Sequence, residues 1–391
     1  MTTRRTFFST AGMATGAALA DTTGAAQKTS RTPTVELMKV GVVGLGENSH
    51  LNFSIWSPII NPLEPDVWPV RTTRMLITHA WDSRPDVADA YAKKYKCEAV
   101  RHYDDMVDKV DTMIFGGFNE AKWWLQLTKP YIEAGIPCFI NRPLAYRMKD
   151  ARAIVDLAKK HNTPIMCAEE RETFKEAHVG RIKVTELIGD GKTIIGVNSS
   201  NAAGEYPQHA IHGLVFLLAL FGLDVGHVSY QADGWWRDPI PSAPNPQHYG
   251  LLTLHYRGIT IPGVGEQTVP FMAAQHQFDK YIASDNTVRI YYSDGGHGGW
   301  WDLDQHDPTG NYTQRLYSLF YPAVFAMERM FETREMPQSY DYMLKKTQIF
   351  LAGFKSHLEH HGGLVSVDDL PDDWEAPNPY PDWIDASIFD E

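Results

Sequence analysis

Short apolar runs alternate with amphipathic segments between residues 34 and 168. The runs have the length and bounding turns of β-strands, and the segments between them have the spacing of helices with one apolar face. The expected strands are Val35–Val43, Met75–Trp81, Asp111–Phe115, Cys138–Ile140 and Pro164–Ala168. The expected helices are Asp86–Lys96, Ala121–Ala134 and Ala151–His161. Alternation of this kind implies right-handed crossovers, so we predict a Rossmann-type, doubly wound α/β domain with a parallel sheet.

The pattern changes after residue 168, where strand-like runs follow one another with few helices between them. These runs are Thr193–Ser199, Val228–Ala232, Gly250–Tyr256, Val269–Gln277 and Val288–Tyr292. They predict a second α/β domain over residues 169–370, with a large, mostly antiparallel sheet that has one open face. Helical spacing returns at Tyr321–Glu332 and Tyr340–Glu359. The tail, residues 371–391, has acidic residues and no basic ones, and is either loose or wrapped around a partner subunit.

Two adjacent arginines, Arg4 and Arg5, precede a mildly apolar stretch from Ala11 to Ala20. This arrangement is typical of a twin-arginine export signal, and a small residue such as Ala26 offers a cleavage site. We therefore expect residues 1–33 to be a signal and linker, and the protein to be periplasmic or secreted. A disordered basic N-terminus is the alternative. No apolar run approaches the length of a membrane span, so no membrane insertion is expected.

Charge and side-chain content narrow the range of partners. The 391-residue chain has a net charge of −12 at pH 7 and no run rich in Lys and Arg, which argues against nucleic acid and anionic membranes. None of the three cysteines forms a CxxC pair, so buried thiols are expected. Trp235–Trp236 and Trp300–Trp301 are placed in loops, where the indoles either stack on a saccharide or anchor the loops.

A glycine turn at residues 44–49 follows the first strand. Glycines there let backbone N–H groups approach a pyrophosphate, and a carboxylate at the end of the second strand, Asp82, can accept hydrogen bonds from ribose hydroxyls. The cofactor-binding candidates are Gly44, Gly46, Asn48, Ser49 and Asp82. Asp82 favours NAD, and the neighbouring Arg84 leaves NADP as an alternative. Prolines between residues 58 and 69 imply that the helix after the turn is short or precedes a long loop. A vestigial fold without cofactor is the remaining alternative.

The segment Phe139-Ile140-Asn141-Arg142-Pro143-Leu144-Ala145 resembles the Gfo/Idh/MocA family of glucose–fructose oxidoreductases and inositol dehydrogenases. Members carry a Glu-Lys-Pro or Asp-Lys-Pro triplet after the fifth strand. The likeness runs from Val35 to about Leu370 and includes the glycine turn and Ile211-His212-Gly213 before an apolar helix. It implies a Rossmann domain, a substrate domain with an open sheet, bound NAD or NADP, and a sugar-like substrate. Many exported relatives carry twin-arginine signals, and an open sheet favours a homo-oligomer.

The chain departs from this family at three positions. Arg142 replaces the family's lysine, and Asn141 replaces the acid before it. Arginine stays charged at any working pH, so it binds an oxygen atom but cannot act as a base. Gln208 stands where an aspartate often precedes the family's histidine, whereas His212 matches that histidine.

Catalytic candidates gather around these positions. His212 is the first of them, because a neutral imidazole takes up a proton near neutral pH. Tyr206 beside the cationic Arg142 is a second acid or base, with a surface or stacking ring as the alternative. Asn141 and His209 complete the set of catalytic candidates.

Two further groups lie near these candidates. His209 and His212 share one helix face and have Glu170, His276 or His297 as further ligands, but two histidines are a weak signal and we predict no metal. The expected strand Pro164–Ala168 is followed by Glu169, Glu170 and Arg171, which either face the cleft or form a solvated salt-bridge cluster.

Three functions are consistent with these residues. The first is an exported, NAD-dependent enzyme that transfers hydride to or from a sugar carbon, with His212 as acid or base, either as a dehydrogenase or as a transient oxidation step in glycoside cleavage. The second is a lyase that performs β-elimination on a uronate-containing saccharide, with Tyr206 and His212 as base and acid and with Asn141 and Arg142 neutralising the carboxylate. The third is a non-catalytic sugar-binding protein.

Overall fold

The structure is a computed structural model of the whole chain. It describes residues 36–47, 49–52, 56–61, 73–173, 175–202, 210–232, 250–278, 286–293, 297–303, 312–378 and 380–390. Residues 1–35, which carry the expected export signal, lie outside the described residues.

The first sheet is parallel throughout and has the strand order β3-β2-β1-β4-β5-β6. Its strands are β1 Met38–Val43, β2 Met75–Trp81, β3 Glu98–Ala99, β4 Thr112–Phe115, β5 Cys138–Ile140 and β6 Ile165–Met166. The crossover helices are α2 Pro85–Tyr95, α3 Trp124–Glu133 and α4 Met148–His161. The central strands are buried on both faces, which explains their continuous apolar runs. The predicted Rossmann-type domain is therefore confirmed.

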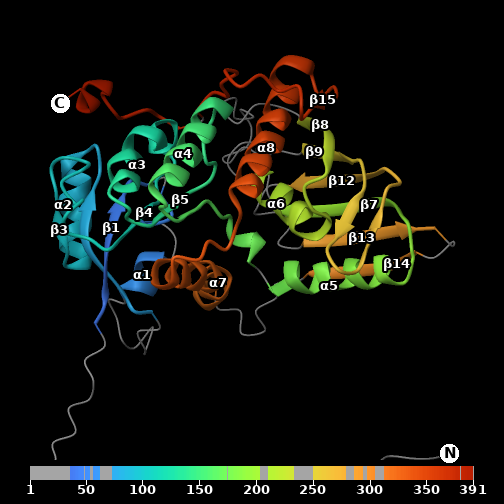
Figure 1. Cartoon of the computed structure of the whole chain (residues 1–391), viewed down its shortest axis with the longest axis horizontal. Helices are drawn as coiled ribbons and strands as arrows, with labels where there is room; N and C mark the ends of the chain where they lie inside the picture. Colours follow the sequence, from blue (N-terminus) through green and yellow to red (C-terminus); the bar gives the residue numbers. More distant parts are fainter. Residues whose placement is uncertain are drawn as a thin grey trace, which may run out of the picture. The chain divides into compact units, whose positions relative to one another are not determined.

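The helix after the glycine turn is short, as the prolines indicated. α1 spans only Trp56–Ile60. The long helix α7, Tyr312–Thr333, lies beside it and contributes Val324 and Met327 to the same hydrophobic core (Figure 1). The periodicity placed the start of this helix nine residues later, at Tyr321. The C-terminal part of the chain thus returns to cover the first sheet.

The second sheet has seven strands in the order β14-β13-β7-β12-β9-β8-β15. The strands are β7 Ile194–Ala202, β8 Val225–Ala232, β9 Gly250–Tyr256, β12 Phe271–Phe278, β13 Asn286–Tyr292, β14 His297–Leu303 and β15 Val365–Ser366, with a separate ribbon of β10 Ile259–Ile261 and β11 Gly265–Gln267. Only the β12–β7 pair is parallel, which confirms a mostly antiparallel sheet. The expected loop at Trp300–Trp301 is wrong: both residues lie in β14, because pairing with β13 outweighs the turn signal of the preceding glycines.

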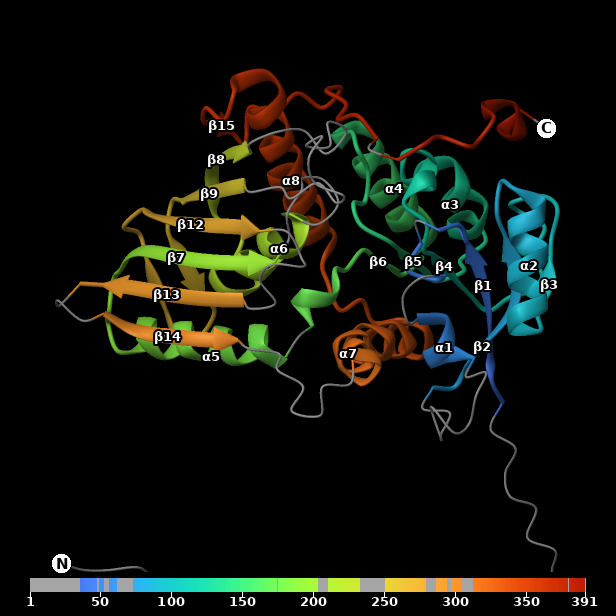
Figure 2. The same cartoon turned by 180° about the vertical axis from the view of Figure 1, so that it is seen from behind.

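Three helices pack against this sheet or against one another beside it (Figure 2). α6 Ala210–Phe221 contacts β7 and β12, α8 Tyr340–His360 contacts β8, and α5 Lys175–Gly189 contacts α6. Helical periodicity did not reveal α5, whose apolar positions do not concentrate on one face. Along β9 every second residue is buried, so successive side chains face the core and the open side in turn.

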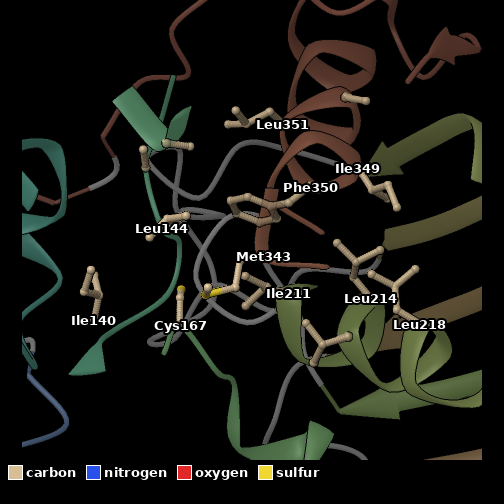
Figure 3. Packing of buried hydrophobic residues seen from close by; sticks show 14 of the residues in the cluster. Ile140, Leu144, Cys167, Ile211, Leu214, Leu218, Met343, Ile349, Phe350 and Leu351 are labelled. Atoms are coloured by element: carbon tan, nitrogen blue, oxygen red, sulfur yellow. The ribbon is translucent and has the colours of Figure 1, made fainter. Parts of the chain in front are cut away.

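One hydrophobic core runs from the first sheet into the second domain. Leu144 and Cys167, which follow β5 and β6, point toward Ile211 of α6 and toward Met343 and Phe350 of α8 (Figure 3). All five side chains are at most 3% exposed. This packing places the ends of β5 and β6 directly beside the first turn of α6. Among the described residues, no helix combines the length and the apolar character that crossing a bilayer requires.

Candidate active site

The first turn of α6 places His212 between a carboxylate and a guanidinium. Its Nδ1 atom contacts Oε1 of Glu169, and its Nε2 atom lies 3.1 Å from Nη2 of Arg142. A guanidinium only donates hydrogen bonds, so the His212 Nε2 atom accepts and the Nδ1–H donates to Glu169. The contacts thus assign one tautomer, with the Nε2 lone pair directed away from Glu169.

Arg142 lies immediately after β5, at the carboxyl edge of the parallel sheet. Its side chain is 4% exposed, its Nε atom lies 3.9 Å from Oε1 of Glu169, and its guanidinium lies 4.9 Å from the centre of the Phe118 ring. Ligands of open α/β sheets bind at this carboxyl edge. The sheet therefore presents Phe118, Arg142 and Glu169 from three adjacent strand ends, and α6 adds His212.

Burial makes His212 a neutral base. The imidazole side chain is only 14% exposed. Burial holds the pKa of His212 well below its usual range, and the Arg142 charge lowers it further, although Glu169 acts in the opposite direction. A neutral ring can accept a proton from a substrate hydroxyl at Nε2 once that hydroxyl takes the place of the Arg142 N–H on the Nε2 lone pair.

One residue of this site, His50, escaped the sequence analysis, which left Glu169 either facing the cleft or in a solvated salt-bridge cluster. Glu169 is 1% exposed and directly contacts His212, so a solvated salt-bridge cluster is wrong for this residue. His50 is buried and makes edge contacts with Trp56 and Phe118, each at 4.8 Å between ring centres. Burial, followed by the Arg142 charge, lowers the pKa of His50 well below its usual range. The position of Glu169 at the end of the sixth strand was the one available signal.

Asn141 is buried behind the site. Its amide nitrogen donates to the carbonyl of Gly116 at 2.8 Å, and its Oδ1 atom accepts from the Arg142 backbone at 3.0 Å. It thereby ties the end of β5 to the end of β4 and orients the Arg142 backbone. Its expected contact with a substrate carboxylate finds no support in this geometry.

The other predicted catalytic residues, Tyr206 and His209, lie outside the described residues, as do Gln208 and Asn48. So do Trp235 and Trp236. Within the part of the chain that the structure describes, no group of three or more His, Cys, Asp or Glu side chains is arranged to hold a metal ion.

The glycine turn has the tight geometry expected of it. Gly44 has φ +78°, and a Cβ there would lie 2.8 Å from the backbone of Gly117. Ser49 donates from Oγ to the carbonyl of Gly44 at 2.5 Å and accepts from the Leu51 N–H at 3.1 Å. Ser49 therefore holds the shape of the turn, and its contact with a phosphate remains a prediction.

Asp82 is buried just after β2, where its carboxylate accepts hydrogen bonds from the backbone. Its Oδ2 atom accepts from the Leu45 N–H at 2.7 Å, and its Oδ1 atom accepts from the Arg84 N–H at 3.0 Å. The Leu45 N–H has no hydrogen-bond partner in the sheet, and the buried carboxylate of Asp82 supplies one. Both carboxylate oxygens of Asp82 therefore already accept backbone hydrogen bonds, and its contact with ribose hydroxyls remains a prediction.

The space beside the glycines is the part of the turn that suits a pyrophosphate. A Cβ on Gly46 would meet Nη2 of Arg84 at 2.1 Å, and a Cβ on Gly117 would meet Oε2 of Glu120 at 1.9 Å. The absence of side chains at these glycines therefore leaves a cradle, which Arg84 and Glu120 enter. If those two side chains turned away, the backbone of residues 44–47 together with Arg84 would hold the phosphates of NAD.

The buried Glu120 beside the glycine turn makes the free energy of unfolding of the protein depend on pH. Burial, followed by the charge of Asp82, raises the pKa of Glu120 from 4.5 to about 8. The folded state therefore binds a proton that the unfolded state releases, and stability falls by about 1.4 kcal/mol per pH unit between about pH 5 and 8. We expect Glu120→Gln to remove this slope, as measured by urea unfolding across that range.

Glu133→Gln, at an exposed position on α3, is the matched control for Glu120→Gln and should leave the slope unchanged. An unaltered pH dependence in Glu120→Gln would show that Glu120 is ionised in the folded protein.

A parallel sheet with a glycine turn, and a neutral histidine beside its carboxyl edge, are features typical of dinucleotide-dependent oxidoreductases. Residues 38–169 match the Gfo/Idh/MocA model, described as an oxidoreductase family with an NAD-binding Rossmann fold. Residues 38–169 are therefore similar to a family whose Rossmann fold binds NAD.

Solved structures share the fold of most of the chain. A probable dehydrogenase from Thermotoga maritima matches with a TM-score of 0.60 and 14% identity over 85% of this chain and 100% of that one. A scyllo-inositol dehydrogenase from Lactobacillus casei, with bound NAD(H) and scyllo-inositol, matches at 0.60 and 15% over 85% and 100%. A myo-inositol 2-dehydrogenase from Lactobacillus plantarum matches at 0.59 and 14% over 84% and 99%. No curated protein sequence matches the chain.

Proposed function

We propose that the protein is an NAD-dependent oxidoreductase that oxidises a secondary hydroxyl of a sugar or cyclic polyol. The observation that carries this proposal is the neutral His212, with Nδ1–H bound to Glu169 and Nε2 beside Arg142. The inositol dehydrogenases among the structural neighbours support the substrate class.

Each residue has a separate role in this reaction. Nε2 of His212 takes the hydroxyl proton, and Glu169 stabilises the imidazolium that forms. Arg142 binds the hydroxyl oxygen as negative charge develops on it. Because a guanidinium does not lose its proton, the role of base falls on His212. NAD, when bound, supplies the acceptor for the hydride of the same carbon.

The purified protein tests this proposal. We expect it to bind NAD and to produce NADH absorbance with inositols or simple sugars. Activity on a saccharide by protein that is demonstrably free of NAD and NADH would contradict the proposal.

Glu169→Gln should lower kcat about 10- to 100-fold, because the amide no longer stabilises the imidazolium. It should also move the acidic limb of the pH–rate profile to lower pH, since the loss of the carboxylate lowers the pKa of His212 further. Glu186→Gln, at an exposed pair with Lys183, is the control. An unchanged pH profile in Glu169→Gln would remove Glu169 from the mechanism.

The proposal also covers the type of reaction, the location of the enzyme and its assembly. The hydride transfer either completes a dehydrogenation or serves as a transient oxidation in glycoside cleavage. Arg4 and Arg5 direct the enzyme out of the cytoplasm.

A second copy pairs through the open sheet face, where Ile195 and Met272 are exposed. The lyase alternative has less support, because a substrate carboxylate bound to Arg142 would also meet the charge of Glu169.

A further inference from the structure

The C-terminal end of the chain crosses the carboxyl edge of the nucleotide-binding sheet. This segment, Asn378 and residues 380–389, is called the strap. In Figure 2 the red trace passes α4 and α3 and ends near α2. Asn119 donates to the Pro381 carbonyl at 2.6 Å and accepts from Asn378 at 3.1 Å, and Trp123 donates to Asp382 at 2.9 Å. The strap is therefore bound to the short helix η1 (Asn119–Trp123) that follows β4.

The middle of the strap covers the glycine turn. The Arg84 guanidinium lies 3.4 Å from the centre of the Trp383 ring and 3.2 Å from Oε2 of Glu47. A Cβ on Gly46 would meet Nη2 of Arg84 at 2.1 Å and Trp383 at 3.3 Å. Trp383 thus holds Arg84 directly on the glycine that a pyrophosphate approaches.

Apolar contacts anchor the strap on both sides of the turn. Ile384 is buried in the main core, and Phe389, in the short helix η3 (Ala386–Phe389), contacts Tyr103 and Trp123. Tyr380 stacks on Phe118 at 5.3 Å, the ring that also faces Arg142. The strap is therefore a docked element that extends from the glycine turn to the candidate active site.

Resting on the proposed function, we infer that the strap competes with NAD for the glycine turn. Arg84 and Trp383 fill the space that the glycines leave, so the pyrophosphate can approach only after Trp383 releases Arg84. The acidic side chains of the strap, which include Asp382 and Asp385, also repel phosphate. Displaced from Trp383, Arg84 becomes available to bind the phosphates that it now excludes.

This competition reduces the apparent affinity for NAD. A strap that is closed in about nine of ten molecules weakens apparent binding about tenfold, because only the open fraction binds. Trp383→Ala removes the ring that holds Arg84, so we expect its Kd for NAD to be about tenfold lower than that of the full wild-type chain.

Calorimetric titration with NAD measures the affinity, and hydrogen exchange of residues 380–389 measures the strap itself. NAD should increase exchange in the wild-type strap. The control is Trp374→Ala, which removes an indole that contacts Glu359 and Lys355 of α8, away from the turn, and should leave the Kd unchanged. A chain ending at residue 377 should bind NAD at least as tightly as Trp383→Ala.

The outcomes separate the strap from the proposed function. If the wild-type chain binds NAD and Trp383→Ala binds equally or less tightly, or if NAD leaves strap exchange unchanged, the competition is overturned. If neither the wild-type chain nor either strap variant binds NAD, the proposed function is overturned. Binding by the variants alone supports the competition in its strongest form.

Discussion

Replacing His212 with alanine should lower kcat/KM for the oxidation of a polyol by about a thousandfold. General base catalysis contributes about 10²- to 10⁴-fold, and Arg142 cannot take over proton transfer. The loss should appear mainly in kcat, because the base acts on the proton only as the reaction proceeds. NAD binding should persist, since the glycine turn does not include this residue. Steady-state kinetics with NADH absorbance measure the effect.

The exposed His227 on β8 provides the matched substitution for His212→Ala. His227→Ala should retain wild-type rates, and both variants should unfold at similar temperatures. Retention of more than about a tenth of the wild-type kcat/KM by His212→Ala would exclude His212 as the base.

Local patterns were sufficient for five of the six strands of the nucleotide-binding sheet, and they missed only the two-residue edge strand β3. Its central strands are buried on both faces, so the sequence shows them as continuous apolar runs between helices of regular spacing. The glycine turn is equally local, because Gly44 needs a positive φ that few other residues adopt. The family resemblance singled out His212, and the structure places it beside Arg142 and Glu169 in the candidate active site.

The partners of His212 depend on long-range packing. Glu169 is 43 residues away, and its burial results from the docking of α6 against the end of β6. Nothing in the surrounding Glu-Glu-Arg sequence distinguishes it from an exposed charge cluster. The backbone contacts of Asp82 likewise include the Leu45 N–H, 37 residues away. The same limit applies to the strap, whose contacts join residues about 260 positions apart.

Helix α8 adds a second buried charge beside the site. Lys346 is 4% exposed and lines the same small cavity as Arg142 and Glu169. Its Nζ atom donates to the Cys167 carbonyl at 2.6 Å and to Oε1 of Glu172 at 2.7 Å. Burial raises the pKa of Glu172 although Lys346 lowers it, so the ion pair does not recover the full cost of burying the carboxylate. The pair therefore joins α8 to the end of β6 at a net cost compared with an apolar contact.

Lys346→Met should lower the free energy of unfolding by about 3–5 kcal/mol, because it leaves the buried Glu172 without its counter-charge. Urea unfolding at pH 7 measures the change. The adjacent Lys345→Met is the control: its pair with Asp368 is partly exposed, so its loss should cost less than about 1 kcal/mol.

The double variant Lys346→Met/Glu172→Met separates the ion pair from packing. With both charges removed, we expect stability to return to within about 1–2 kcal/mol of the wild type, since apolar replacement of a buried pair is often neutral or stabilising. A double variant no more stable than Lys346→Met would mean that the hydrogen bond to the Cys167 carbonyl, rather than the charge of Glu172, is the interaction that the lysine provides. In that case α8 would be held beside Arg142 and Glu169 mainly by this backbone contact.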